Sequence, residues 1–217
     1  RQRFDLYLPQ ASPRGLVVFV HGGYWRRFNR KLWSWVAAGP LRHDWAVAIP
    51  GYTLCPDIRI SGITRQIAVA IEHLSTEIEG PIRLVGHSAG GHLVTRMLCP
   101  NVLAPEVGSR IERTVSISGL HDLSPLLRTT MNETLRLSID EAREESAATY
   151  MPAVKARLTC WVGSDELSEF LRQNTLLRHW RDTGMTVTEI EASGHNHFTV
   201  IHPLADPESK LTRELVD

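Results

Sequence analysis

Residues 82–90 have the sequence Ile-Arg-Leu-Val-Gly-His-Ser-Ala-Gly. The first four residues follow the helix-ending pair Gly80-Pro81 and predict a buried strand, and residues 91–98 predict a helix. A strand that leads into a helix through Gly-x-Ser-x-Gly is typical of the nucleophile elbow, a tight turn that lifts a serine hydroxyl above the carboxyl edge of a sheet. The sequence therefore predicts that Ser88 is a nucleophile. The alternative is a glycine-rich turn whose serine caps the following helix.

Short β-branched segments alternate with longer amphipathic segments on both sides of this turn. Parallel strands need long crossover connections, which helices usually fill. We therefore predict an α/β fold with a mostly parallel central sheet and helices on both faces. Residues 3–8 alternate between apolar and polar more regularly, which favours an antiparallel strand at the sheet edge. Further strands are predicted at residues 15–20, 45–49, 114–117, 158–162 and 186–190, and helices at 63–78, 132–150 and 167–180.

The length and the connections predict one domain. The chain has 217 residues, enough to bury one hydrophobic core, and it lacks a linker that would divide it. We therefore treat residues 1–217 as a single domain of this α/β type. The connection at about 121–152 is long for a loop between two strands, so we expect it to form a small cap over the active site.

Composition excludes several classes of function. Lys plus Arg and Asp plus Glu both total 24, so the net charge is zero and no basic field attracts nucleic acid. No apolar segment approaches the roughly 20 residues of a membrane helix, so a membrane protein is not expected. Three unpaired cysteines favour a reducing, cytoplasmic location. The chain begins at Arg1 rather than at Met, so we expect the native chain to begin earlier.

A second glycine-rich loop follows the strand predicted at residues 15–20. It has the sequence His21-Gly-Gly-Tyr-Trp25 and lies at the same sheet edge as the predicted elbow. Acyl transfer builds negative charge on a carbonyl oxygen, which unobstructed backbone N–H groups stabilise. We therefore predict an oxyanion hole formed by Gly22, Gly23 and Ala89, with the N–H of Tyr24 as an alternative donor. Taken alone, this loop is also compatible with a simple turn.

The order serine, acid, histidine restricts the remaining catalytic candidates. The loop after the last predicted strand contains His195 and His197, and one of them is expected to be the base that activates the serine. The loop after residues 158–162 places Asp165 beside Glu166, and either carboxylate is able to orient an imidazole. Asp122 is an outside candidate, because an aspartate at that place more often caps the next helix.

These motifs together resemble the α/β-hydrolase superfamily and, within it, the kynurenine formamidase-like (arylformamidase) branch. The resemblance covers nearly the whole chain and rests on His-Gly-Gly-Tyr-Trp, Gly-His-Ser-Ala-Gly-Gly-His-Leu and Asn-His-Phe. Trp25 and the block Glu169-Phe170-x-Arg172-Gln173 are the more specific signs of the branch. The resemblance implies that Glu166 is the acid and His197 the base. The branch often has Asp at the position of Glu166, so Asp165 stays the alternate acid.

The resemblance further implies a serine hydrolase that cleaves a small ester or a formyl-amide bond through an acyl-enzyme on Ser88. The alternatives are a general carboxylesterase or thioesterase with the same triad and a non-catalytic binding protein with a hydrolase fold. We expect Tyr24, Trp25 and Tyr52 to line the substrate pocket, with Trp33 and Trp35 either there or in helix packing. No cofactor and no metal are expected, since the histidines form no H-x-x-x-H or H-E-x-x-H motif. The expected partner is a small-molecule ester or amide; the oligomeric state stays open, a homodimer included.

Overall fold

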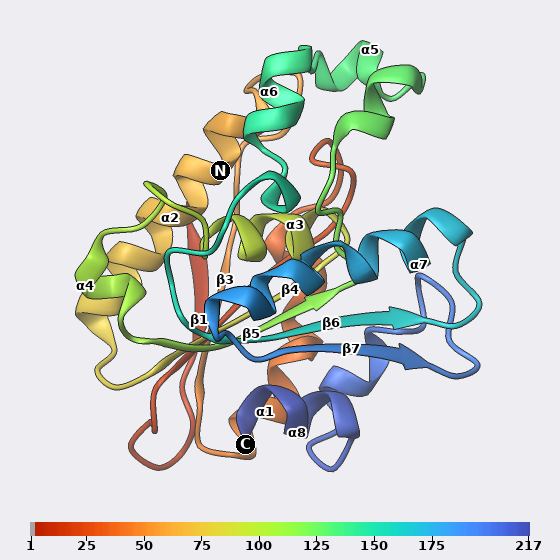
Figure 1. Cartoon of the computed structure of the whole chain (residues 1–217). Helices are drawn as coiled ribbons and strands as arrows, with labels where there is room; N and C mark the ends of the chain where they lie inside the picture. Colours follow the sequence, from red (N-terminus) through yellow and green to blue (C-terminus); the bar gives the residue numbers. More distant parts are fainter. Residues whose placement is uncertain (1–2) are drawn as a thin grey trace.

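This computed structural model describes residues 3–217 of the chain. Its centre is a seven-stranded sheet (Figure 1). The strands lie in the order β1-β3-β2-β4-β5-β6-β7. Their bounds are β1 (Phe4–Tyr7), β2 (Leu16–Val20), β3 (Ala46–Pro50), β4 (Ile82–His87), β5 (Ile111–Ile117), β6 (Arg157–Gly163) and β7 (Val187–Ala192).

Only β1 runs antiparallel to its neighbour in this sheet of described residues, pairing Phe4 with Pro50 and Tyr7 with Val47 of β3. Strands β2 to β7 pair in parallel throughout. Both the antiparallel edge strand and the mostly parallel sheet confirm the predictions from the sequence. The physical reason is that β1 has a single neighbour and only partly buried residues, whereas every residue of β2, β3 and β4 is buried.

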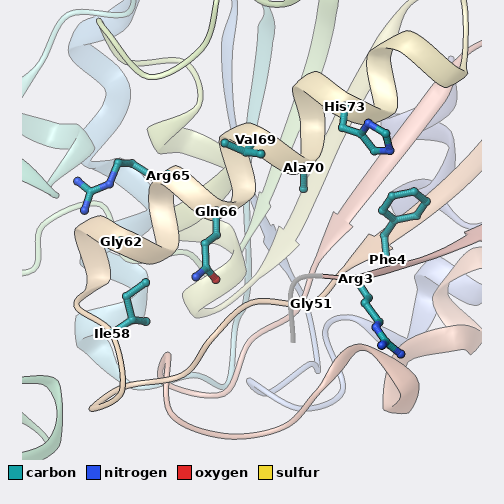
Figure 2. Close-up of a pocket in the computed structure, with 10 residues that line it drawn as sticks. All are labelled: Arg3, Phe4, Gly51, Ile58, Gly62, Arg65, Gln66, Val69, Ala70 and His73. Carbon is teal, nitrogen blue, oxygen red and sulfur yellow. The ribbon is translucent and has the colours of Figure 1, made fainter.

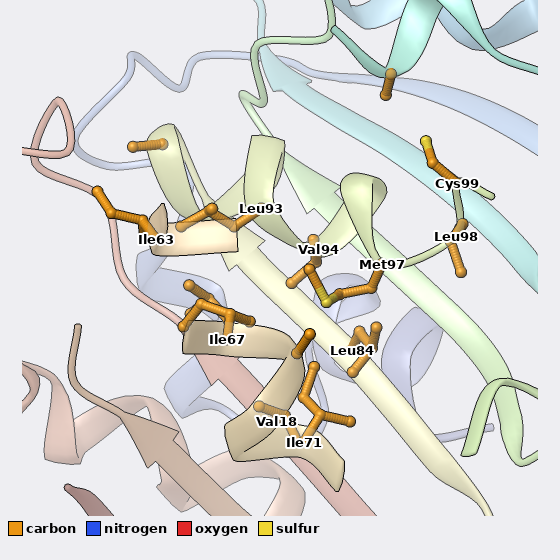
Figure 3. Close-up of a cluster of buried hydrophobic side chains, with 14 of the residues drawn as sticks. Val18, Ile63, Ile67, Ile71, Leu84, Leu93, Val94, Met97, Leu98 and Cys99 are labelled. Atoms are coloured by element: carbon orange, nitrogen blue, oxygen red, sulfur yellow. The ribbon is translucent and has the colours of Figure 1, made fainter. Parts of the chain in front are cut away.

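Helices cover both faces of the sheet, as predicted (Figure 1). One face packs against α2 and α3 through residues such as Val18, Ile67, Leu84 and Leu93, which Figure 3 shows interlocking between the strands and the two helices. The opposite face packs against η1, η5 and α8. The helices are α1 (Ala38–Leu41), α2 (Ile60–Glu77), α3 (Ala89–Arg96), α4 (Pro105–Gly108), α5 (Asn132–Leu135), α6 (Ile139–Glu144), α7 (Ser168–Thr175) and α8 (Lys210–Val216), and the 3-10 helices are η1 (Arg30–Ala37), η2 (Ser124–Arg128), η3 (Ala147–Thr149), η4 (Leu176–Thr183) and η5 (His202–Ala205).

The continuous helix predicted over residues 132–150 is wrong. The structure forms α5, α6 and η3 there instead. Arg136 adopts a left-handed backbone conformation with φ 54°, and the Asn132 side chain bonds both the N–H and the C=O of Leu137, which closes the first turn on itself. A new helix then begins after Ser138, whose hydroxyl accepts the N–H of Glu141 as an N-cap. The polar and apolar residues of this segment are spaced as in one helix, but local side-chain hydrogen bonds divide it into shorter helices.

The strand order positions a functional site. The chain leaves β2 towards β3 on one side and leaves β4 towards β5 on the other, so the loops after β2 and β4 diverge. Such a switch point leaves a crevice at the carboxyl ends of the strands, where ligands bind in open α/β sheets. In this chain the two loops are the predicted oxyanion loop and the predicted elbow. None of the helices within residues 3–217 has the combined length and apolar character that a membrane span requires.

Two backbone approaches at the elbow leave no room for a side chain. A Cβ atom at Gly90 would lie 1.9 Å from the carbonyl oxygen of Val20, and one at Gly86 would lie 2.2 Å from the carbonyl oxygen of Gly90. Both contacts involve backbone, which yields less easily than a side chain. The glycines of Gly-x-Ser-x-Gly are therefore required by the close packing of β2, β4 and α3.

We expect Gly90→Ala to lower the free energy of unfolding by roughly 3 kcal/mol or more, because β2 must move away from α3 to admit the methyl group. Thermal unfolding followed by circular dichroism measures the effect. Gly108→Ala is the control, since its Cβ would meet only a methyl group of Val154, at 3.0 Å. Equal melting temperatures for the two variants would contradict the packing argument.

Candidate active site

Ser88 sits in a strained turn between β4 and α3. Its backbone angles are φ 55° and ψ −116°, a conformation that residues other than glycine rarely adopt. The turn is held from both sides, because the N–H of Ser88 donates to the carbonyl of Ile117 at 2.8 Å and its own carbonyl accepts the N–H of His92 at 3.1 Å. The local geometry is that of the predicted elbow.

His197 and Glu166 come together from the loops after β7 and β6. The Nδ1 atom of His197 lies 2.6 Å from Oε2 of Glu166. The other carboxylate oxygen accepts the hydroxyl of Ser118 at 2.6 Å and the N–H of Gly163 at 2.9 Å. Burial opposes ionisation of this carboxyl, but the hydrogen bonds from His197, Ser118 and Gly163 outweigh it and hold the pKa of Glu166 below its usual value. Glu166 is thus an ionised, fixed acceptor for the imidazole.

This pairing leaves Nε2 of His197 as the ring nitrogen available for proton transfer. His197 and Ser88 line the same cavity. Within residues 3–217 no hydrogen bond joins the Ser88 hydroxyl to the imidazole. Catalytic hydrogen bonds of this kind commonly tighten only when substrate binds.

His87 and Phe170 hold His197 in place, and the sequence interpretation did not assign either a role. The Nε2–H of His87 donates to the backbone carbonyl of His197 at 2.8 Å, and the two ring centroids are 4.8 Å apart. Burial and the neighbouring His197 lower the pKa of His87 to about 3, so this ring stays neutral. Phe170 makes a second ring contact with His197, and the two ring centroids are 4.3 Å apart.

The sequence positions of some of these supporting residues pointed to the site. His87 and Ser118 each lie at the carboxyl end of a predicted buried strand, at the edge where the other candidates gather. Gln173 of the Glu-Phe-x-Arg-Gln block accepts the N–H groups of His121 and Asp122 at 2.6 and 2.9 Å. The block therefore ties α7 to the loop after β5.

The other candidate acids and bases lie apart from this pair. Asp165 is exposed, and its carboxylate accepts the neighbouring hydroxyl of Ser164 at 2.8 Å. His195 contributes its backbone carbonyl to the N–H of Asp165 at 3.0 Å. Asp122 accepts the N–H of Ser124 at 3.0 Å and pairs with Arg172, which places its carboxylate at the start of η2, although the N-cap position itself is Leu123. The geometry therefore joins Glu166, not its acidic neighbours, to His197.

The predicted oxyanion loop touches the elbow. A Cβ atom at Gly22 would lie 3.1 Å from that of Ser88, and Gly23 has φ 116°, a value that favours glycine. Within the described residues, the N–H groups of Gly22, Gly23, Tyr24 and Ala89 have no protein acceptor. Ala89 is the first residue of α3, so its N–H lies outside the intrahelical bonds. None of the four amides is therefore used in a hydrogen bond among the described residues.

Trp25 and Tyr52 do not line the cavity, which corrects the prediction for these two residues. Trp25 is 1% exposed and donates its Nε1–H to Nδ1 of His92 at 3.3 Å, while Nε2 of His92 donates to the carbonyl of Glu145 at 2.7 Å. Tyr52 is 2% exposed and donates its hydroxyl to the carbonyl of His21 at 3.0 Å. Both aromatic side chains find buried polar partners and pack beneath the loop, which they hold in shape.

The cavity next to Ser88 has a volume of about 310 Å³. Tyr24 lines it as predicted, and so do Trp33 and Trp35. The full lining is Gly23, Tyr24, Phe28, Leu32, Trp33, Trp35, His87, Ser88, His197, Phe198, Ile201 and His202. The segment 121–152 contributes none of these described residues; it bonds α2 and α3 through the ion pairs Arg59–Glu141 and Arg96–Glu145. Its role as a cap stays a prediction.

A second cavity of about 410 Å³ lies between β1 and α2, away from the elbow (Figure 2). Phe4, Ile58 and Val69 supply apolar walls, and Arg65 and His73 lie at its sides. None of the candidate catalytic residues lines it. Across residues 3–217, no three side chains of His, Cys, Asp or Glu are grouped so as to hold a metal ion.

Comparison with known proteins agrees with this geometry. The sequence model of the alpha/beta hydrolase family matches residues 17–210. The chain belongs to the alpha/beta hydrolase family. Within that family it is kynurenine formamidase-like, because it is 31% identical to the kynurenine formamidase of Danio rerio over 99% of this chain and 77% of that protein.

Solved structures extend the comparison. A crystal structure provisionally described as a thioesterase, from Silicibacter sp. TM1040, superposes with a TM-score of 0.93 and is 49% identical, covering 99% of this chain and 80% of that chain. An esterase from Pyrobaculum calidifontis superposes with a TM-score of 0.79 at 16% identity, covering 97% of this chain and 76% of that chain. The second likeness shows the hydrolase fold alone.

The four buried histidines predict a loss of stability in acid. Burial lowers the pKa of His21 from 6.5 to about 4, and the pKa values of His87, His92 and His121 to about 3. Between those values and pH 6.5 the unfolded chain binds more protons than the folded one. The free energy of unfolding therefore falls as pH drops through this window, by up to about 1.4 kcal/mol per pH unit for each histidine.

Urea titrations at several pH values between 8 and 5 measure this effect. We expect His121→Phe to make the dependence less steep, since one buried titrating group is removed. His73→Gln, at an exposed histidine, is the matched control. A free energy of unfolding that is constant between pH 7 and pH 5 would contradict neutral, buried histidines.

Proposed function

We propose that this hydrolase is a serine enzyme that cleaves a small ester or formyl-amide bond through an acyl-enzyme on Ser88. The observation that carries the proposal is the 2.6 Å contact between His197 Nδ1 and the buried carboxylate of Glu166, in a cavity that His197 shares with Ser88. An imidazole oriented in this way presents a basic nitrogen to the hydroxyl of a serine held at an elbow.

In the proposed reaction, Nε2 of His197 takes the proton of the Ser88 hydroxyl as its oxygen attacks the substrate carbonyl. The tetrahedral oxyanion accepts hydrogen bonds from the free amides of Ala89 and of Gly22, Gly23 or Tyr24. The imidazolium then protonates the leaving alcohol or amine as the carbon–heteroatom bond breaks. Water, deprotonated by the same imidazole, attacks the acyl-serine and releases the acid and the free hydroxyl.

Glu166 acts in this scheme by stabilising the imidazolium while it exists. Its carboxylate is already satisfied by Ser118 and Gly163, so no rearrangement is required when the positive charge forms. The scheme uses side chains and backbone amides of this chain and needs no cofactor.

The relatives support two substrate classes. The likeness to kynurenine formamidases favours a formyl anilide such as N-formylkynurenine or a small ester. The second candidate is a carboxylesterase or thioesterase with the same catalytic residues, which is favoured by the 49% identity to the structure provisionally described as a thioesterase. Ranking formyl anilides, short acyl esters and acyl thioesters by kcat/KM separates these classes.

The buried, unpaired Cys55, Cys99 and Cys160 support our further proposal of a reducing, cytoplasmic location.

We expect a fluorophosphonate probe to label the protein at Ser88 and Ser88→Ala to abolish both labelling and hydrolysis of p-nitrophenyl acetate. His197→Ala should lower kcat by about 10³-fold or more, because the hydroxyl then lacks its base. Mass spectrometry locates the label. A folded protein that neither reacts at Ser88 nor hydrolyses any ester would instead be a non-catalytic binding protein.

A second prediction distinguishes the two adjacent carboxylates. Glu166→Gln keeps the shape of the side chain but removes the charge that stabilises the imidazolium, so kcat should fall by roughly 10³ to 10⁴-fold. Asp165→Asn is the matched control and should change kcat little, because Asp165 is exposed and its carboxylate accepts a hydrogen bond from its neighbour Ser164 rather than from His197. A larger loss in Asp165→Asn than in Glu166→Gln would reverse the assignment of the acid.

A further inference from the structure

His92 contacts both parts of the predicted oxyanion hole. Its backbone N–H donates to the carbonyl of Ser88 at 3.1 Å, within the first turn of α3, whose first residue is the proposed donor Ala89. Its ring accepts the indole N–H of Trp25, in the loop after β2, at 3.3 Å. We propose that His92 is a positioning residue that fixes the predicted oxyanion loop against the elbow through its hydrogen bond with Trp25. This role rests on the proposed function and deepens it, because His92 acts on the oxyanion donors rather than on the substrate.

The predicted oxyanion loop has a strained backbone that needs support from outside the loop. Gly23, Tyr24 and Trp25 have φ values of 116°, 53° and 55°, a range that residues other than glycine rarely occupy. Such angles persist only where the surrounding structure imposes them. The carbonyl of Trp25 accepts the N–H of Cys55 at 2.8 Å, and its indole, in a residue that is 1% exposed, bonds His92. Trp25 is therefore the residue through which both supports act on the loop.

A single tautomer of His92 makes the hydrogen bond with Trp25 possible. The indole N–H is only a donor, so Nδ1 of His92 must be unprotonated to accept it. The ring proton then lies on Nε2, which donates to the carbonyl of Glu145 at 2.7 Å. His92 is 0% exposed, and burial lowers its pKa to about 3, so the ring stays neutral at neutral pH. Glu145 thus fixes the tautomer that Trp25 requires, and an edge-to-face contact of the Trp25 and His92 rings, with centroids 5.2 Å apart, accompanies the bond.

The position of the loop matters because the loop lies directly on the serine. A Cβ atom at Gly22 would be 3.1 Å from that of Ser88, so a movement of the loop changes the spacing between its amides and the reacting hydroxyl. An error of about 1 Å in such spacing lowers a rate by roughly 10²-fold. His92 and Trp25 are not among the described residues that line the cavity. Loss of their bond should therefore weaken binding of the transition state and leave binding of the ground-state substrate unchanged.

Two variants remove the bond from opposite sides. His92→Phe keeps a ring but has no acceptor, and Trp25→Phe keeps a ring but has no donor. Each should lower kcat/KM for p-nitrophenyl acetate by about 10 to 100-fold, which is less than the loss of a whole oxyanion donor. Circular dichroism shows whether each variant is folded. Should His92→Phe fail to fold, Trp25→Phe tests the same bond from the side of the loop.

A transition-state analogue separates a displaced oxyanion hole from a general loss of structure. With phenyl trifluoromethyl ketone, the oxygen of Ser88 adds to the carbonyl carbon, the hydroxyl proton passes to His197, and the carbonyl oxygen becomes an oxyanion. The inhibition constant of this ketone should rise in each variant by about the same factor as kcat/KM falls. Acetophenone, whose carbonyl is not activated for addition, should inhibit the wild type and the variants equally.

The double variant tests whether the two side chains act through one bond. Because both single variants break the same contact, the combination of Trp25→Phe and His92→Phe should lose no more kcat/KM than the more impaired single variant. His121→Phe is the matched control. His121 is equally buried, but its ring bonds the hydroxyl of Thr95 at 3.3 Å rather than the loop, so kcat/KM should stay close to the wild-type value.

Several results would overturn the role of His92. These are a wild-type kcat/KM in a folded single variant, losses that multiply in the double variant, and an equal loss in His121→Phe. A fall in kcat/KM with an unchanged inhibition constant for the trifluoromethyl ketone would overturn it as well. A folded wild-type protein that hydrolyses no ester would instead count against the proposed function.

Discussion

The close approach of three backbone segments at the elbow is the constraint on which the rest of the site depends. The carbonyl of Val20 at the end of β2 lies where a Cβ of Gly90 would be, and Gly22 lies against Ser88. Because β2 and β4 are neighbours whose chains leave in opposite directions, their loops meet only at this switch point. The contact brings Ser88 and the loop after β2 to one place, and a side chain at Gly90 would separate them.

A second group of contacts fixes the imidazole against this point. Glu166 bonds one ring nitrogen of His197, while His87 bonds the backbone of the same residue and Phe170 packs on its ring. These three contacts come from β6, β4 and α7 or the loops that follow them. The imidazole, five residues after the last strand, thereby gains a defined orientation from other parts of the fold in addition to the contact of its ring with Phe198. His87 also connects the serine turn directly to the loop of the base.

Buried histidines also form hydrogen bonds that hold neighbouring segments together. His92 accepts from Trp25 and donates to the Glu145 carbonyl, so a single neutral tautomer links the loop after β2 to the residue that follows α6. Trp25 and Tyr52 likewise bond buried polar partners, whereas Tyr24, Trp33 and Trp35 line the cavity. The neighbouring residues Tyr24 and Trp25 thus differ, because Tyr24 lines the cavity whereas Trp25 is buried and bonds His92.

The sequence by itself determined the order of strands and helices, the edge strand, and the elbow, because periodicity and glycine placement are local properties. Residue patterns narrowed the acid to Asp165 or Glu166, with Asp122 as an outside candidate, and the base to His195 or His197, and the family resemblance then selected Glu166 and His197. The tertiary structure showed that Glu166 rather than Asp165 meets His197, that Ser118 bonds the same carboxylate, and that residues 132–150 form short helices. The first two depend on which way a loop side chain points across a gap between strands, whereas the short helices follow from local side-chain bonds of Asn132 and Ser138. Such a direction is set by partners distant in the chain, such as Ser118 for Glu166, and local sequence periodicity does not specify which side chains meet.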